Sequence, residues 1–257
     1  MRRVIVLTAV VLAWSAVAGA QFVAPGGSIP VVANIPGEEE TFWHSDVSIF
    51  NLSSAATSVT LVLFPELTDE GPAFEMMTYG PVPIPGGGQV TLPDVVARNF
   101  QLHGVKGGLS VFSDDFQPLV LASRTYTDAP DGGSFGQNVT GVAISRKGWV
   151  AGIQQDGFFR TNIGIFLPTD PSPDTIVFAV TVRDGDGEEV GSGSLLFDQA
   201  GLQQMNLALF GVQPPLLDGT VEIRCDEDYV VWFAYASVVD QITGDAVFRP
   251  AIGQATQ

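Results

Sequence analysis

The sequence predicts an all-β protein made of two tandem antiparallel β-sandwich domains that arose by internal duplication. Residues 42–50 (FWHSDVSIF) return as residues 158–166 (FFRTNIGIF), and residues 122–128 return in the same order as residues 234–240. Short runs rich in Val, Ile, Thr and Phe are bounded by Gly, Pro, Asp and Asn, which is typical of strands. Two matches in the same order indicate two copies of one domain.

Residues 1–20 have the features of a secretory signal peptide. Arg2 and Arg3 precede a short apolar run, and Ala18 and Ala20 flank Gly19 as a small-residue cleavage site. The apolar run is shorter than the roughly 20 residues that a membrane-spanning helix needs. We therefore expect bacterial-type export to the periplasm or the extracellular space, with no membrane insertion after cleavage.

The first copy is predicted to cover residues 27–146 and to alternate strands with turns. Residues 57–64 place apolar side chains at every second position, and residues 119–127 form the longest expected strand. Residues 93–100 are predicted to form a single helical turn that Asp94 caps. About seven strands in some 115 residues, with frequent turns, indicate a sandwich.

The second copy is predicted to cover residues 147–254 with the same order of elements. Residues 175–182 match the strand at 57–64, and the Asp-Gly pairs at 184–187 predict a tight hairpin. Residues 198–205 are predicted to form the equivalent helical turn. Residues 230–239 are apolar on both faces, so we expect this strand to be covered by the first copy or by a partner chain.

The charge balance excludes some classes of partner. The chain has 28 Asp and Glu residues against 11 Lys and Arg residues, a formal net charge of −17. Such a surface repels nucleic acid, because binding to phosphates requires basic groups. The single cysteine, Cys225, excludes an intramolecular disulfide, and we expect it to be buried and inert on a strand.

Two segments resemble known proteins. Residues 123–137 contain SRTY and GSFGQ, and residues 234–245 contain AYASVVD followed by TGD. Both are similar to segments of secreted bacterial proteins with tandem immunoglobulin-like β-sandwich repeats. The resemblance implies an immunoglobulin-like fold and export, and it implies no activity, because such folds host adhesion, carbohydrate binding and spacing alike.

The acidic turns are candidate calcium sites. Residues 184–187 begin like a calcium loop, but position twelve is Leu195 where an EF-hand needs Glu, so the EF-hand interpretation fails. Carboxylates also cluster at the same turn in both copies, which we predict to join the two strands of a C-terminal hairpin. A solvated turn and a weak calcium site both remain open. The candidate ligands are Asp184, Asp186, Asp114, Asp115, Asp226 and Asp228.

The positions at which the copies differ are candidate ligand-binding positions. An acidic insertion at 38–40 is specific to the first copy, and exposed aromatic side chains would suggest a platform on which sugars stack. Packing against the core would equally explain the aromatic residues. The candidate ligand-binding residues are Trp43, His44, Phe159, Arg160, Arg124 and Tyr126.

No motif indicates catalysis. His44 and His103 are the only histidines and have no partner at metal-ligand spacing, and Gly-x-Ser-x-Gly is absent. We therefore predict no catalytic residues and a non-enzymatic structural or adhesive module, whose partner is a cell-surface glycan or another protein. A carbohydrate-binding module, with or without calcium, is the alternative. A glycan-acting hydrolase with an unrecognised carboxylate pair is the third hypothesis.

Overall fold

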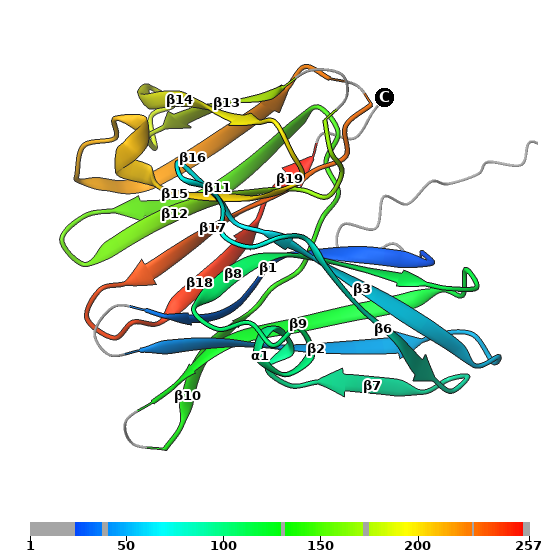
Figure 1. Cartoon of the computed structure of the whole chain (residues 1–257). Helices are drawn as coiled ribbons and strands as arrows, with labels where there is room; N and C mark the ends of the chain where they lie inside the picture. Colours follow the sequence, from blue (N-terminus) through cyan, green and yellow to red (C-terminus); the bar gives the residue numbers. More distant parts are fainter. Residues whose placement is uncertain (1–23, 38–40, 130–131, 172–174, 228, 254–257) are drawn as a thin grey trace, which may run out of the picture.

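Two stacked β-sandwiches make up the molecule (Figure 1). The structure, a computed structural model, describes residues 24–37, 41–129, 132–171, 175–227 and 229–253. The predicted signal peptide therefore lies outside the described residues, as do the acidic insertion at 38–40 and Asp228. Neither of the two short helices in the described part of the chain is long and apolar enough to cross a membrane.

The first half runs from β1 to β10 and the second half from β11 to β19. In the first half the elements are β1 (Gly26–Pro36), β2 (Phe42–Asn51), β3 (Thr57–Pro65), β4 (Leu67–Thr68), β5 (Gly71–Pro72), β6 (Met77–Ile84), β7 (Gln89–Leu92), α1 (Val95–Asn99), β8 (Val105–Ser113), β9 (Leu119–Asp128) and β10 (Ser134–Asn138). In the second half they are β11 (Lys147–Gln155), β12 (Phe159–Leu167), β13 (Ile176–Arg183), β14 (Glu189–Phe197), β15 (Gly201–Asn206), the 3-10 helix η1 (Leu207–Phe210), β16 (Leu216–Cys225), β17 (Phe233–Asp240), β18 (Ala246–Pro250) and β19 (Ile252–Gly253).

The strand pairings of the two halves correspond. One sheet of the first half has the strand order β1–β8–β3–β6, and the corresponding sheet of the second half has the order β11–β16–β13–β14. The other sheet of the first half has the order β7–β2–β9–β10, and its counterpart in the second half has the order β15–β12–β17–β18. This correspondence is what a duplication predicts, and the duplication itself stays an inference.

The all-β sandwich is confirmed, but the connections differ from those of an immunoglobulin domain. In that fold the first two strands are neighbours in one sheet. Here β11 and β12 lie in different sheets, and so do β16 and β17. In the first half β1 and β2 also pair, over residues 34–36 and 42–44, and this pairing joins its two sheets. The prediction that the acidic turns close C-terminal hairpins is therefore wrong, because β8–β9 and β16–β17 are crossings between sheets.

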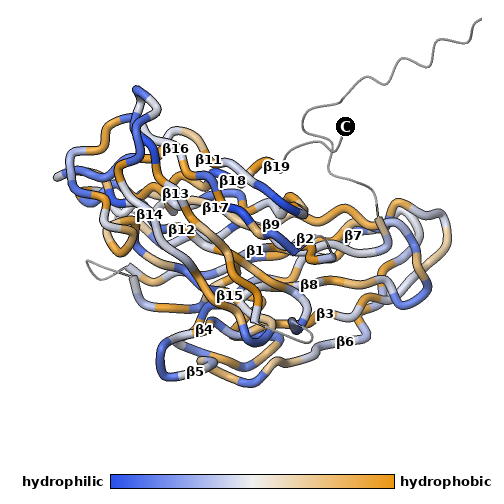
Figure 2. The backbone as a smooth tube through the Cα atoms, turned by 90° about the horizontal axis from the view of Figure 1, so that it is seen from above, coloured by the Kyte–Doolittle hydropathy of each residue, from blue (hydrophilic) through white to orange (hydrophobic). Residues whose placement is uncertain are grey.

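Alternation of apolar and polar residues explains most strands. In β13 every second side chain is buried, from Ile176 to Val182, and its neighbours along the strand are more exposed. These side chains join the core of the second sandwich, and the first sandwich has a core of its own. Hydrophobic stretches follow the strands and hydrophilic ones gather at many of the turns (Figure 2). Cys225 is buried in the core of the second half, as expected.

The outer face of the sheet β15–β12–β17–β18 packs on the first half. Phe166 and Phe233 stack with their ring centroids 6.0 Å apart, and Phe64 of the first half meets Phe166 edge-on at 5.4 Å. These side chains belong to the core cluster of the first half. The expectation that the doubly apolar strand is covered is therefore confirmed from Trp232, which is fully buried, to Val239, whereas Val231 is 49% exposed.

Two local predictions need correction. The segment 198–205 is not helical, because residues 201–206 form strand β15 against β12, and a helical turn follows directly after it as η1. The helix at residues 95–99 exists, but Asp94 does not cap it: its side chain makes no capping bond and its backbone is left-handed, with φ 45°. Its carboxylate bonds with Asn34 instead.

Candidate functional site

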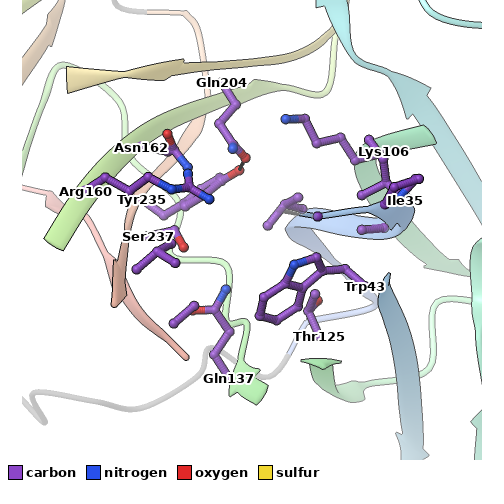
Figure 3. Close-up of a pocket in the computed structure, with 16 residues that line it drawn as sticks. Ile35, Trp43, Lys106, Thr125, Gln137, Arg160, Asn162, Gln204, Tyr235 and Ser237 are labelled. Carbon is purple, nitrogen blue, oxygen red and sulfur yellow. Dashed lines mark hydrogen bonds between the residues drawn. The ribbon is translucent and has the colours of Figure 1, made fainter. Parts of the chain in front are cut away.

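A cavity of about 450 Å³ lies between the two halves (Figure 3). This volume falls within the roughly 300–1,000 Å³ typical of small-molecule sites, which often form where two domains meet. Its wall combines apolar, aromatic, amide, hydroxyl and basic side chains. The lining residues are Val31, Ala33, Ile35, Pro36, Gly37, Trp43, Lys106, Thr125, Gln137, Arg160, Asn162, Gln204, Tyr235, Ser237, Val239 and Ala246.

The period of two along the strands places the side chains of the second half on the cavity wall. In β12, Ile163 and Ile165 point into the core, so Arg160 and Asn162 face the other way. In β17, Ala234 and Ala236 lie in the same core, and the alternate residues face the first half. The cavity is thus lined by the outer face of a sheet whose inner face fills the second sandwich.

Tyr235 is a fixed hydrogen-bond donor at the cavity wall. Its hydroxyl donates to Gln204 Oε1 at 2.7 Å, and its ring stacks on Phe248 with centroids 5.1 Å apart. Gly164 makes room for this ring, since a Cβ there would lie 2.3 Å from two of its atoms. Burial, and secondarily the charge of Glu66, raises the pKa of Tyr235 well above its usual range. The hydroxyl therefore stays protonated.

Trp43 supplies the large aromatic surface of the cavity. Its indole lies against the backbone of Gly37, where an added Cβ would come within 2.6 Å of the indole nitrogen. Below it, Thr125 and Ser45 share a hydrogen bond of 2.7 Å between their hydroxyls. The close-up shows Trp43 and Gln137 on one side of the space and Gln204 across from them (Figure 3).

The amide of Gln137 is incompletely bonded. Its side-chain oxygen is buried and accepts no hydrogen bond from any residue that the structure describes. A buried acceptor without a donor is costly, by about 1–3 kcal/mol. Because Gln137 lines the cavity, a ligand hydroxyl or a bound water would satisfy it.

Two basic residues line the cavity, and none of the lining residues that the structure describes is acidic. Lys106 Nζ lies 3.0 Å from Glu66 Oε1, so its charge is largely offset. Arg160 extends from β12 and also borders a small neighbouring cavity of about 20 Å³, which it shares with Trp43. Asp240 lines that smaller space, but its Oδ1 accepts from the backbone N–H groups of Ile242 and Thr243.

Four predicted ligand-binding residues are not in this cavity. His44 and Tyr126 lie on the opposite face of the sheet from Trp43, with ring centroids 5.8 Å apart. Arg124 lies over the Tyr126 ring at 4.7 Å. Burial, then the charges of nearby carboxylates, raises the pKa of Tyr126. Phe159 is partly buried at the start of β12 and does not line the cavity.

The two histidines come together on this opposite face. Asn34 Nδ2 donates to both carboxylate oxygens of Asp94, at 3.0 and 3.1 Å. His44 Nδ1 lies 3.4 Å from Asp94 Oδ2, and His103 Nδ1 lies 3.3 Å from Asn34 Oδ1. Asp46 completes the network by accepting from the backbone N–H of Asp94 at 2.9 Å. The sequence analysis found no partner for either histidine, because residues 34, 44, 94 and 103 are far apart in the chain.

Strand pairing shifts the alignment of the two copies by one residue. The sequence match places Arg124 with Ala236, but β9 pairs Arg124 with Asp46 and β17 pairs Ser237 with Asn162. Since Asp46 and Asn162 match, Arg124 corresponds to Ser237. A shift of one residue moves a side chain to the other face of its strand. The sequence match would therefore assign Arg124 to the position of Ala236, whose side chain is buried in the core of the second half.

The acidic turns are engaged in local hydrogen bonds. Asp184 Oδ1 accepts from the N–H groups of Asp186 and Glu188, and Asp114 accepts from the hydroxyls of Ser58 and Thr60. Asp115 accepts from Thr57 and Ser113.

Asp226 Oδ1 lies 3.2 Å from Arg224 Nε, and Asp228 lies outside the described residues. Among the described residues no group of three or more His, Cys, Asp or Glu side chains is placed to hold a metal ion.

Of the predicted ligand-binding residues, the structure thus brings only Trp43 and Arg160 to the cavity. The polar residues that complete the cavity could not be predicted from the sequence, because they lie on segments that meet only when the halves pack. The one signal available was the repeat itself, in which Arg160 and Asn162 replace His44 and Asp46. The missed polar residues are Lys106, Thr125, Gln137, Asn162, Gln204, Tyr235 and Ser237.

Comparison with known proteins shows no family. No protein-family model and no curated protein matches the chain. A similar solved structure is the Anabaena sensory rhodopsin transducer, 14% identical over 41% of this chain and 99% of that chain, with a TM-score of 0.30. Another is the tandem CBM22-1–CBM22-2 domain of Paenibacillus barcinonensis Xyn10C, 10% identical over 88% of this chain and 92% of that chain, with a TM-score of 0.22. These likenesses are too slight to bear on function.

Proposed function

We propose that the chain is an exported, non-enzymatic β-sandwich module that binds a small carbohydrate in the cavity between its halves. The observation that carries the proposal is the composition of the cavity wall, in which the Trp43 ring faces side-chain amides and hydroxyls from both halves. A sugar has apolar C–H faces, which pack on an aromatic ring, and hydroxyls, which bond with amides.

The polar groups suit a ligand that both donates and accepts hydrogen bonds. Gln204 Oε1 accepts from the Tyr235 hydroxyl, so the donor group that Gln204 presents to the cavity is its amide nitrogen. The oxygen of Gln137 needs a donor. Asn162 and Ser237 add one amide and one hydroxyl from neighbouring strands. A purely apolar ligand would leave these groups unpaired.

A structural or adhesive role is the second candidate, and one observation favours it. The packing of Phe64, Phe166 and Phe233 between the halves holds the two sandwiches together without a flexible linker. Two sandwiches fixed in this way make a stiff spacer. This role needs no ligand, so a binding experiment separates the two candidates.

Calorimetry with a panel of neutral and acidic monosaccharides and disaccharides, with and without calcium, tests the proposal. We expect at least one sugar to bind, and Trp43→Ala to weaken its binding about tenfold or more, which is ~1.4 kcal/mol. Tyr126→Ala is the matched control, since this aromatic residue lies on the opposite face of the same sheet. Absence of binding to every sugar would leave the spacer role. Equal losses in both variants would place binding elsewhere.

A further inference from the structure

The charges around the cavity are segregated. Acidic residues outnumber basic ones by 28 to 11 in the whole chain, yet the part of the cavity wall that the structure describes holds Arg160 and Lys106 and no carboxylate. Burial disfavours charges of both signs, so burial alone would have removed the basic residues as well. The described wall therefore keeps two cations and has no group that would repel an anion.

The two halves differ in sign at matched positions. Arg160 in β12 corresponds to His44 in β2, and Asn162 corresponds to Asp46. On the solvent-facing sheet of the first half, these positions hold a titratable imidazole and a carboxylate. On the sheet that lines the cavity, they hold a permanent cation and a neutral amide. At these two positions β12, which lines the cavity, is therefore more positive than β2.

We propose that the ligand is a sugar that carries a carboxylate, a uronic acid, and that Arg160 binds this group. The inference rests on the proposed function. A guanidinium has five N–H donors in a planar fork that matches a carboxylate, so Arg160 can keep its protein contacts and still donate to the ligand. Lys106 is less suited, because Glu66 already holds its ammonium at 3.0 Å.

The remaining wall fits the rest of a uronic acid. Trp43 offers its ring to the apolar face of the sugar, and Asn162, beside Arg160 on β12, offers an amide to a hydroxyl. Charge-assisted hydrogen bonds are roughly twice as strong as neutral ones. A uronic acid should therefore bind more tightly than the neutral sugar of the same stereochemistry.

Calorimetry with two matched pairs, galacturonic acid with galactose and glucuronic acid with glucose, tests this inference on the full chain. In at least one pair we expect the acid to bind about tenfold or more tightly than its neutral partner. This preference should disappear in Arg160→Gln and persist in Arg124→Gln, an identical change on the opposite face of the first sheet. Affinity for the acid should also fall with added salt, and affinity for the neutral sugar should not.

Several outcomes would overturn the inference. Equal affinity for acid and neutral sugar would overturn it and leave the proposed function standing, whereas no binding of any sugar would overturn both. Acetate binding as tightly as the uronic acid would mean a carboxylate site without sugar recognition. If Arg160→Gln lowers the melting temperature, Arg160→Lys replaces it: this variant keeps the charge and loses the fork, so it should retain part of the preference.

Discussion

Gly108 lies directly against the ring of Phe166, across the junction of the two halves. A Cβ built on Gly108 would come within 2.2 Å of two ring atoms. Phe166 is fully buried and is held by Phe64 on one side and Phe233 on the other, so its ring has no room to move away. The absence of a side chain at position 108 is therefore a condition for the two sandwiches to pack as they do.

Gly108→Ala should destabilise the protein by about 1–3 kcal/mol, as expected for overpacking a filled core. Chemical denaturation measures this loss. Gly157→Ala is the matched control, because a Cβ at that exposed glycine meets nothing within 4 Å. A Gly108→Ala protein as stable as the control would show that the halves are not packed through Phe166.

Asn34→Ala should cost about 1–3 kcal/mol, because it removes both hydrogen bonds from a buried amide to the Asp94 carboxylate. Asn138→Ala is the comparison: the side chain of this exposed residue donates to the Thr140 hydroxyl, so we expect a change within about 0.5 kcal/mol. Urea midpoints of the two variants give the difference. Similar midpoints would mean that the network around Asp94 contributes nothing to stability.

Stability in acid should depend on Asp115. The hydrogen bond from the Thr57 hydroxyl, with help from Ser113, lowers the pKa of Asp115 below its ordinary value of 3.8. A lowered pKa in the folded state favours folding above pH 3.8, and this contribution is lost as the pH falls below that value. In Asp115→Asn the free energy of unfolding should therefore fall less steeply over this acid range.

The control for Asp115→Asn is Asp186→Asn, which removes one exposed carboxylate from a different turn. Denaturant titrations at several acid pH values compare both variants with the parent chain. A curve for Asp115→Asn as steep as that of the parent would contradict the role of the Thr57 hydrogen bond.

Millimolar calcium should leave the melting temperature unchanged. The Asp184 carboxylate already accepts two backbone N–H groups, and Asp114 accepts two hydroxyls. An ion that bound only the folded state would raise the melting temperature by linkage. A rise that Asp184→Asn abolishes would instead identify the hairpin turn as the calcium site.

Local patterns predicted the strands well and failed where pairing decides the structure. Alternation located β3, β9 and β13 to within two residues, since one buried face is enough to specify a strand. Residues 201–206 gave no such signal and became β15 because β12 offered an unpaired edge. The pairing of β15 with β12 depends on how the rest of the chain folds, so the residues of β15 alone do not predict it.

The candidate site was predictable only in part, for a related reason. Trp43 and His44 are neighbours in sequence, so alternation requires that they face opposite sides of the sheet. Alternation does not say which side the other half covers. The cavity forms on the side of the sheet that the second half covers, so Trp43 lines it and His44 does not.

The lone thiol of Cys225 gives the second half of the molecule a chemical handle of its own. It is 1% exposed within the core of the second sandwich, and burial raises its pKa, so a thiol reagent can reach it only after that sandwich opens. The rate of Cys225 labelling, compared with the rate of global unfolding, would tell whether the second sandwich opens on its own or together with the first.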